Sequence, residues 1–73
     1  MSIVMYTKPN CPYCQQARDY YNSNNIKFTE YDAMYDRERQ REMLEFSNGD
    51  PTVPTIVENG KYVRSGWGDP PRG

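Results

Sequence analysis

Two cysteines separated by two residues, in the segment Cys11-Pro12-Tyr13-Cys14, follow closely on a continuous apolar run at residues 3–7. A run of this kind is typical of a strand that is covered on both faces of a sheet. Pro12 suits the first position of a helix, where its missing N–H would have no partner in any case. The chain must therefore adopt a fold that joins a buried strand to a helix and places both thiols at the start of that helix.

The first half of the chain predicts two strands and two helices. From Pro12 onward, Cys14, Ala17 and Tyr21 form one apolar stripe of a helix that ends in the run of Asn and Ser at residues 22–25. Residues 26–31 alternate in character, which indicates a second strand. A charged segment from about residue 35 to 47, closed by Asn and Gly, predicts the second helix.

The second half predicts a hairpin and a non-helical tail. Residues 55–58 and 61–64 flank Asn59-Gly60, the pair that a tight two-residue turn favours. The element order is then βαβαββ, an α/β fold with a mixed four-stranded sheet. We expect the first two strands to be parallel and the last two to be antiparallel. Residues 66–73 contain Pro70 and Pro71 and are predicted to be non-helical.

Length and composition exclude several classes of protein. The chain has 73 residues, which predicts a single domain over residues 1–73. It has no histidine and only two cysteines, so we expect no metal site. The net charge is −1 without blocks of Lys or Arg, so neither nucleic acid nor a membrane surface is expected as a partner. Seven tyrosines and two phenylalanines predict a largely aromatic core.

The lone cysteine pair indicates thiol chemistry. The sequence shows neither a signal peptide nor a long apolar stretch, so we expect a cytoplasmic protein. In that reducing compartment a cysteine pair is more often redox-active than structural. The start of the helix and Lys8 should lower the pKa of Cys11 and favour its thiolate, the attacking species in exchange. Cys14, one turn later, would then resolve the mixed disulfide. The alternatives are an inert buried pair and half of a zinc site shared between two chains.

Other residues admit both a structural and a functional interpretation. Thr52-Val53-Pro54 is a simple strand boundary or, with a cis bond before Pro54, a segment that turns the backbone of Val53 toward a peptide-like ligand. The charged helix is a solvated face, or Arg37 or Arg39 helps Lys8 hold a ligand carboxylate. Trp67 is either a lid on the core or part of a partner surface. Asp69 is a solvated turn residue, a cap or a group that binds an amine.

Taken together, these residues resemble the glutaredoxin family of the thioredoxin superfamily. The matching pieces are residues 6–8, Cys-Pro-Tyr-Cys at 11–14, Thr-Val-Pro at 52–54 and the hairpin at 59–61, and the similarity covers residues 2–64. The resemblance implies a thioredoxin-like fold and a cis Val53–Pro54 bond. It also implies that glutathione lies along Val53 with its sulfur at Cys11. The residues that it places beside glutathione are Lys8, Tyr13 and Thr52. The full set of candidate glutathione-binding residues also includes Val53, Pro54, Arg37 and Asp69.

The chain departs from the family pattern after residue 64. Glutaredoxins follow the last strand with two glycines, a small or polar residue and an Asp that grips the γ-glutamyl end of glutathione. Here the segment is Ser-Gly-Trp-Gly-Asp at residues 65–69, and Asp69 is displaced. The closing helix of the family is absent because Asp69-Pro70-Pro71 forbids it.

The expected function is that of a dithiol glutaredoxin, which reduces protein disulfides and mixed disulfides of glutathione with glutathione as reductant. Ser65-Gly66-Trp67 is also similar to a segment of the redoxins that serve ribonucleotide reductase and take electrons from thioredoxin reductase, which gives the first alternative. The second is a non-enzymatic binding module whose cysteines are idle. Pro12 disfavours an iron–sulfur cluster between two chains.

Overall fold

Strands and helices alternate along the chain in the order that the sequence predicts. In this computed structural model, which describes residues 2–73, the elements are β1 (Ile3–Thr7), α1 (Pro12–Ser23), β2 (Thr29–Asp32), α2 (Arg37–Phe46), β3 (Thr55–Glu58) and β4 (Lys61–Ser65). The four strands form one sheet in the order β2-β1-β3-β4. The β1–β2 pair is parallel, and the β1–β3 and β3–β4 pairs are antiparallel. This confirms the predicted βαβαββ order and the mixed sheet.

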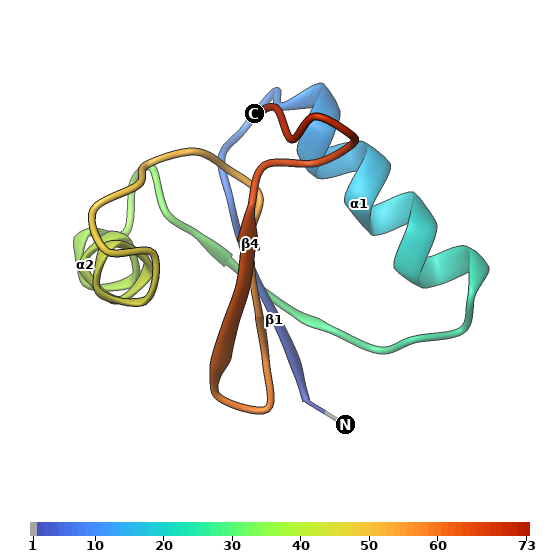
Figure 1. Cartoon of the computed structure of the whole chain (residues 1–73), viewed down its shortest axis with the longest axis horizontal. Coiled ribbons are helices and arrows are strands. Elements are labelled where there is room, and N and C mark those ends of the chain that lie inside the picture. The colour runs from blue at the N-terminus through green and yellow to red at the C-terminus, as the bar shows by residue number, and fades with distance from the viewer. Residues whose placement is uncertain (1) are drawn as a thin grey trace.

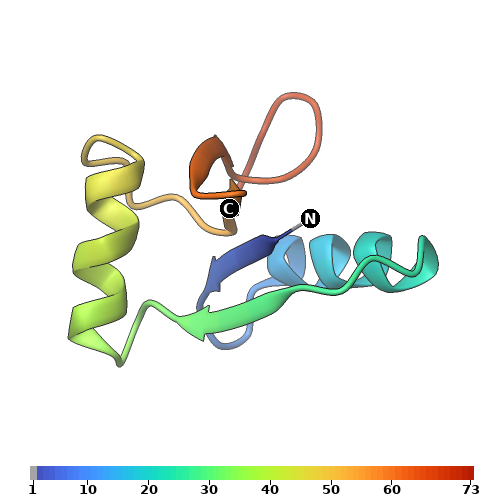
Figure 2. The same ribbon diagram turned by 90° about the horizontal axis from the view of Figure 1, so that it is seen from below.

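The two helices lie on opposite sides of the sheet (Figures 1 and 2). Because neighbouring residues of a strand point to opposite faces, β1 supplies both cores, as its continuous apolar sequence predicts. The core on the α2 side contains Tyr6, Ala33, Met43, Val53 and Val57, together with both cysteines. The core on the α1 side contains Ile3, Met5, Ala17, Tyr21 and Ile56.

Local signals in the sequence explain where the elements begin and end. Asp36 accepts hydrogen bonds from the backbone N–H groups of Glu38 and Arg39 at 3.2 and 3.3 Å and so caps the start of α2. Asn25 takes a φ of 55° after α1, the left-handed conformation that ends a helix. Asn59 and Gly60 have φ values of 52° and 78°, as a two-residue hairpin turn requires.

Several predicted boundaries are wrong by a few residues. The second strand was expected at residues 26–31, but β2 begins at Thr29, the first of its residues to pair with β1. Ile26 instead donates its N–H to the carbonyl of Tyr21 at 2.8 Å, and Ile26 and Phe28 pack on the α1-side core. The second helix spans residues 37–46 instead of 35–47, since its cap is Asp36. The last strand runs one residue further, to Ser65.

The prediction of a largely aromatic core is also wrong. Only Tyr6 and Tyr21 among the aromatic residues are buried, and the other buried hydrophobic residues are aliphatic or sulfur-containing. Tyr20, Tyr35 and Tyr62 are exposed. A tyrosine hydroxyl needs a polar partner when it is buried, so most tyrosines keep that end in water.

Residues 66–73, which we call the C-terminal segment, contain no helix, as the sequence predicts. Trp67 and Arg72 pair as an isolated antiparallel bridge, which closes the segment into a loop. In Figure 1 the C-terminal end lies at the same end of the sheet as the start of α1.

Candidate active site

Cys11 is the residue that caps the start of α1. Its backbone is extended, with φ −105° and ψ 108°, and its Sγ accepts a hydrogen bond from the backbone N–H of Cys14 at 3.3 Å. Pro12 occupies the first helical position, as the sequence predicts. The first N–H groups of a helix have no partner within the helix and carry partial positive charge. The sulfur of Cys11 therefore lies where a negative charge is stabilised.

Cys14 lies in the first turn of α1 and is the more deeply buried of the two thiols. Its exposure is 0%, against 6% for Cys11, and neither cysteine is in a disulfide. Burial raises the pKa of Cys14 to about 12, and the hydrogen bond with Cys11 adds to this effect. Cys14 therefore keeps its proton at neutral pH, while Cys11 faces the helix N–H groups. Within one helical turn, the structure thus favours a negative charge on the sulfur of Cys11 and a proton on the sulfur of Cys14.

The Thr52–Pro54 segment lies beside the two thiols. Val53 is buried in the same core cluster as Cys11 and Cys14, and the Val53–Pro54 bond is cis, as the resemblance implies. Thr52 is held on both sides, because its N–H donates to Asp50 at 2.9 Å and its carbonyl accepts from the hydroxyl of Thr55 at 2.9 Å. The fold therefore joins two motifs that are about forty residues apart in the sequence.

A small apolar cavity opens next to this segment. Its volume is about 140 Å³, and its lining includes Lys8, Met34, Met43 and Val53. Lys8, exposed in the turn after β1, therefore lines the same cavity as Val53.

The other candidate ligand residues are less closely grouped. Tyr13 is half-buried against the α2-side core. Arg37 is exposed at the start of α2 and lines a neighbouring surface depression, and Asp69 is exposed in the C-terminal segment. Arg39, the other arginine considered, pairs with Glu42 at 3.0 Å and lies over the ring of Tyr31. Arg39 and Glu42 are three residues apart on α2, and ion pairs at this spacing are typical of a solvated helical face.

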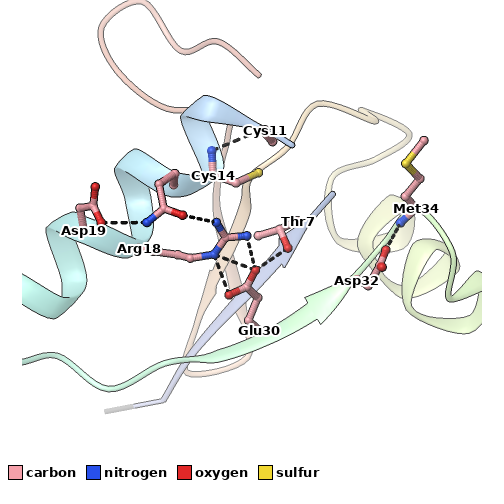
Figure 3. Close-up of polar contacts among 9 residues, drawn as sticks. Thr7, Cys11, Cys14, Arg18, Asp19, Glu30, Asp32 and Met34 are labelled. Atoms are coloured by element: carbon pink, nitrogen blue, oxygen red, sulfur yellow. Dashed lines mark hydrogen bonds and ion pairs between the residues drawn. The ribbon is translucent and has the colours of Figure 1, made fainter. Parts of the chain in front are cut away.

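A polar network that the sequence analysis did not identify joins α1 to β1 and β2 (Figure 3). Arg18 bonds the carboxylate of Glu30 through Nε and Nη2, with a shortest distance of 2.6 Å. Glu30 also accepts from the hydroxyl of Thr7 at 2.7 Å, and Arg18 Nη1 donates to Gln15 at 2.9 Å. The hydrogen bond from Arg18 holds the pKa of Glu30 below its usual value.

The position of this network relates it to the thiols. Arg18 lies one helical turn after Cys14, and it lines a shallow depression together with Asn10, Cys11, Pro12 and Gln15. The sequence places Arg18 on the polar face of the helix, but the pairing with a residue of β2 depends on the sheet register. A polar residue four positions after Cys14 is the only signal that the sequence offers.

Among residues 2–73, no three His, Cys, Asp or Glu side chains are grouped so that they could hold a metal ion. Within the same described range, no helix has the length and apolar character that a bilayer crossing requires.

Comparison with known proteins places this site in a family context. The family model described as Glutaredoxin matches residues 3–63. An uncharacterized glutaredoxin-like 8.6 kDa protein in the rubredoxin operon of Clostridium pasteurianum is 31% identical over 61 residues, which is 84% of this chain and 80% of that protein. Glutaredoxin 3 of Escherichia coli is 31% identical over 62 residues, 85% of this chain and 74% of that protein.

The solved structures show the same arrangement. The solution structure of a glutaredoxin from Brucella melitensis aligns with a TM-score of 0.71 and 32% identity, over 89% of this chain and 70% of that one. The mixed sheet with its two helices is therefore the thioredoxin-like fold that the resemblance implies. The family match ends at residue 63, before the C-terminal segment begins.

Proposed function

This chain belongs to the glutaredoxin family, and from that premise we propose that it is a dithiol thiol–disulfide oxidoreductase in which Cys11 attacks and Cys14 resolves. The observation that carries the proposal is the hydrogen bond from the N–H of Cys14 to Sγ of Cys11 at 3.3 Å. This contact stabilises negative charge on Cys11, whereas burial keeps Cys14 protonated. Cys11 is therefore the attacking thiolate, and Cys14 is the protonated thiol that resolves the mixed disulfide.

The proposed reaction moves two electrons from the dithiol to a disulfide. The Cys11 thiolate attacks one sulfur of the substrate disulfide, forms a mixed disulfide and releases the other sulfur as a thiolate. Cys14 then loses its proton and attacks Sγ of Cys11, which releases the second substrate sulfur and closes the Cys11–Cys14 disulfide. Two molecules of glutathione restore the dithiol and leave as glutathione disulfide. Glutathione keeps thiols reduced in the cytoplasm, and we place the protein in that compartment.

We assign the glutathione site to the backbone of Val53, flanked by Lys8, Tyr13, Thr52 and Pro54. The support is that Val53 packs in one cluster with both cysteines and lines the cavity that Lys8 borders. An extended peptide could pair with the Val53 backbone while its sulfur meets Cys11.

The two charged ends of glutathione are assigned to more distant residues. Arg37, in the depression beside the cavity, would meet a carboxylate, and Asp69 would meet the γ-glutamyl amine. We also propose that residues 1–73 form a single domain, because β1 and β3 contribute to both core clusters.

The roles of the two cysteines are tested with Cys11→Ser and Cys14→Ser. Cys14→Ser should still remove glutathione from a mixed disulfide, because the second glutathione can resolve Cys11, but it should lose the reduction of protein disulfides. Cys11→Ser should lose both activities. An NADPH-coupled assay with glutathione reductase measures the first activity, and reduction of insulin disulfides by dithiothreitol measures the second. If Cys11→Ser keeps either activity, the assigned roles are wrong.

A further control addresses the non-enzymatic alternative. Iodoacetamide labelling at neutral pH should modify Cys11 faster than a free cysteine whose pKa is about 8.5. Equal labelling rates would favour a binding module with idle cysteines. Replacing glutathione and its reductase with thioredoxin reductase in the coupled assay tests the other electron donor.

A further inference from the structure

The C-terminal segment is fastened to Pro54, a candidate ligand residue that directly precedes β3. The N–H of Gly66 donates to the carbonyl of Pro54 at 2.8 Å. Trp67 and Arg72 exchange two backbone hydrogen bonds, at 2.7 and 2.9 Å, which closes the loop between them. At Gly66 a Cβ would lie 2.9 Å from the backbone nitrogen of Arg72, so the returning strand of the loop packs closely on residue 66.

An aromatic anchor holds the base of the segment on α1. The ring of Trp67 packs against Tyr20 and Tyr21, with ring centroids 5.5 and 6.0 Å apart. The guanidinium of Arg64 lies 5.2 Å from the centre of the Trp67 ring and donates to the carbonyl of Gly68 at 2.6 Å. This confirms Trp67 as a lid on the core, one of the two roles considered from the sequence.

The end of the segment lies on the carbonyl group of Val53. A Cβ built at Gly73 would collide with the carbonyl oxygen of Val53, and it would lie 2.9 Å from Cγ2 of Thr52. The backbone of residue 73 therefore occupies the space in front of this carbonyl. A ligand N–H has to approach a carbonyl oxygen to about 2.9 Å in order to bond it. Residue 73 and such a ligand cannot be present together.

We propose that residues 71–73 determine the specificity of the site by competing with glutathione for the backbone edge of Val53. This inference rests on the proposed function, and it names the segment that limits the access of glutathione to its site. Glutathione binds only after residues 71–73 leave the edge, while Trp67 stays anchored on α1. If residues 71–73 cover the Val53 carbonyl about nine-tenths of the time, only about one-tenth of the molecules can bind glutathione. The apparent KM for glutathione is then raised about tenfold.

Two variants test the competition. One lacks residues 70–73, and the other is Gly73→Ala, whose added methyl group collides with the carbonyl of Val53 and displaces the end. Both should lower the KM for glutathione several-fold in the NADPH-coupled assay and leave kcat unchanged. Ser23→Ala is the control, because it lies at an exposed position at the end of α1, outside the C-terminal segment, and leaves residue 73 in place. Its KM should equal that of the unchanged chain.

Binding without chemistry gives a second readout. S-methylglutathione cannot undergo exchange, and its affinity, measured by calorimetry, should rise in both variants by the factor by which KM falls. An unchanged or weaker affinity in Gly73→Ala would overturn the proposal, even if the shortened chain does not fold. Reduction of insulin by dithiothreitol distinguishes a failure of the proposed competition from a failure of the proposed function. If all chains reduce insulin but their affinities for S-methylglutathione are equal, only the competition is wrong; if none reduces insulin, the proposed function is wrong.

Discussion

Arg18 and Glu30 join the helix that carries the thiols to the edge strand β2, and we expect this ion pair to contribute measurably to stability. The shortest distance between the two side chains is 2.6 Å, and their exposures are 26% and 30%. Exposed ion pairs contribute about 0.2–1 kcal/mol, and a guanidinium that bonds a carboxylate through two nitrogens lies at the upper end. We therefore expect a coupling energy of about 1 kcal/mol between the two residues.

A double-mutant cycle isolates this coupling energy. Glu30→Gln removes the charge at nearly constant size, and Arg18→Met keeps much of the aliphatic part of the side chain. Urea unfolding, followed by the fluorescence of Trp67, gives the free energy of unfolding of the four chains at pH 7. A chain of this size has an m-value of about 1 kcal/mol per molar urea, so the coupling should correspond to about 1 M in the midpoint. Glu45→Gln, at an exposed position of α2, serves as the charge control.

The pH dependence gives the result that would refute this reasoning. The pKa of Glu30 is lower in the folded chain than its ordinary value of about 4.3. The contribution is therefore complete above that value and is lost as the pH falls through the lower pKa of the folded chain. A coupling energy below about 0.3 kcal/mol at pH 7 would mean that the pair does not hold α1 to the sheet. A coupling that stays constant from pH 7 to pH 2 would assign it to packing.

Two further predictions concern the core. Tyr6→Phe removes the 2.7 Å hydrogen bond to Glu42 and should lower the free energy of unfolding, measured in urea, by about 1 kcal/mol. The loss is no larger because the half-exposed carboxylate of Glu42 can bond water instead. The pKa of Glu42, which this bond holds below its usual value, should rise in an NMR titration; no change would contradict the bond. Ile56→Ala empties a position with 0% exposure and should cost about 3 kcal/mol of a total of about 4–11 kcal/mol for this chain length. Val63→Ala, at an exposed site, should change stability by less than about 0.5 kcal/mol, and equal effects of the two variants would refute the assignment of the core.

The sequence predicts most of the fold because its strongest signals are local. The apolar run of β1, Pro12 at the start of α1 and Asn59-Gly60 in the hairpin each specify a backbone conformation within a few residues. The start of β2 is different, because it depends on where the strand first pairs with β1. Ile26 and Phe28 have strand-like character but pack on the α1-side core. Only the packed structure decides whether such residues pair in β2 or pack against the core.

The candidate site divides in the same way. Cys11 and Cys14 are recognisable because they are three residues apart at the start of one helix, where geometry follows directly from spacing. Arg18 and Glu30 are twelve residues apart on different elements, so no periodicity in the sequence connects them. The same holds for residue 73 and Val53, whose contact depends on the path of the whole C-terminal segment.

By itself, the sequence determined the positions of the two thiols, the order of strands and helices, and the non-helical end, since each of these follows from short-range backbone preferences. Only the tertiary structure decided which carboxylate holds Arg18 and what lies in front of the Val53 carbonyl. Burial and long-range contact depend on how separate elements pack together. That packing is a property of the whole chain, and no single segment encodes it.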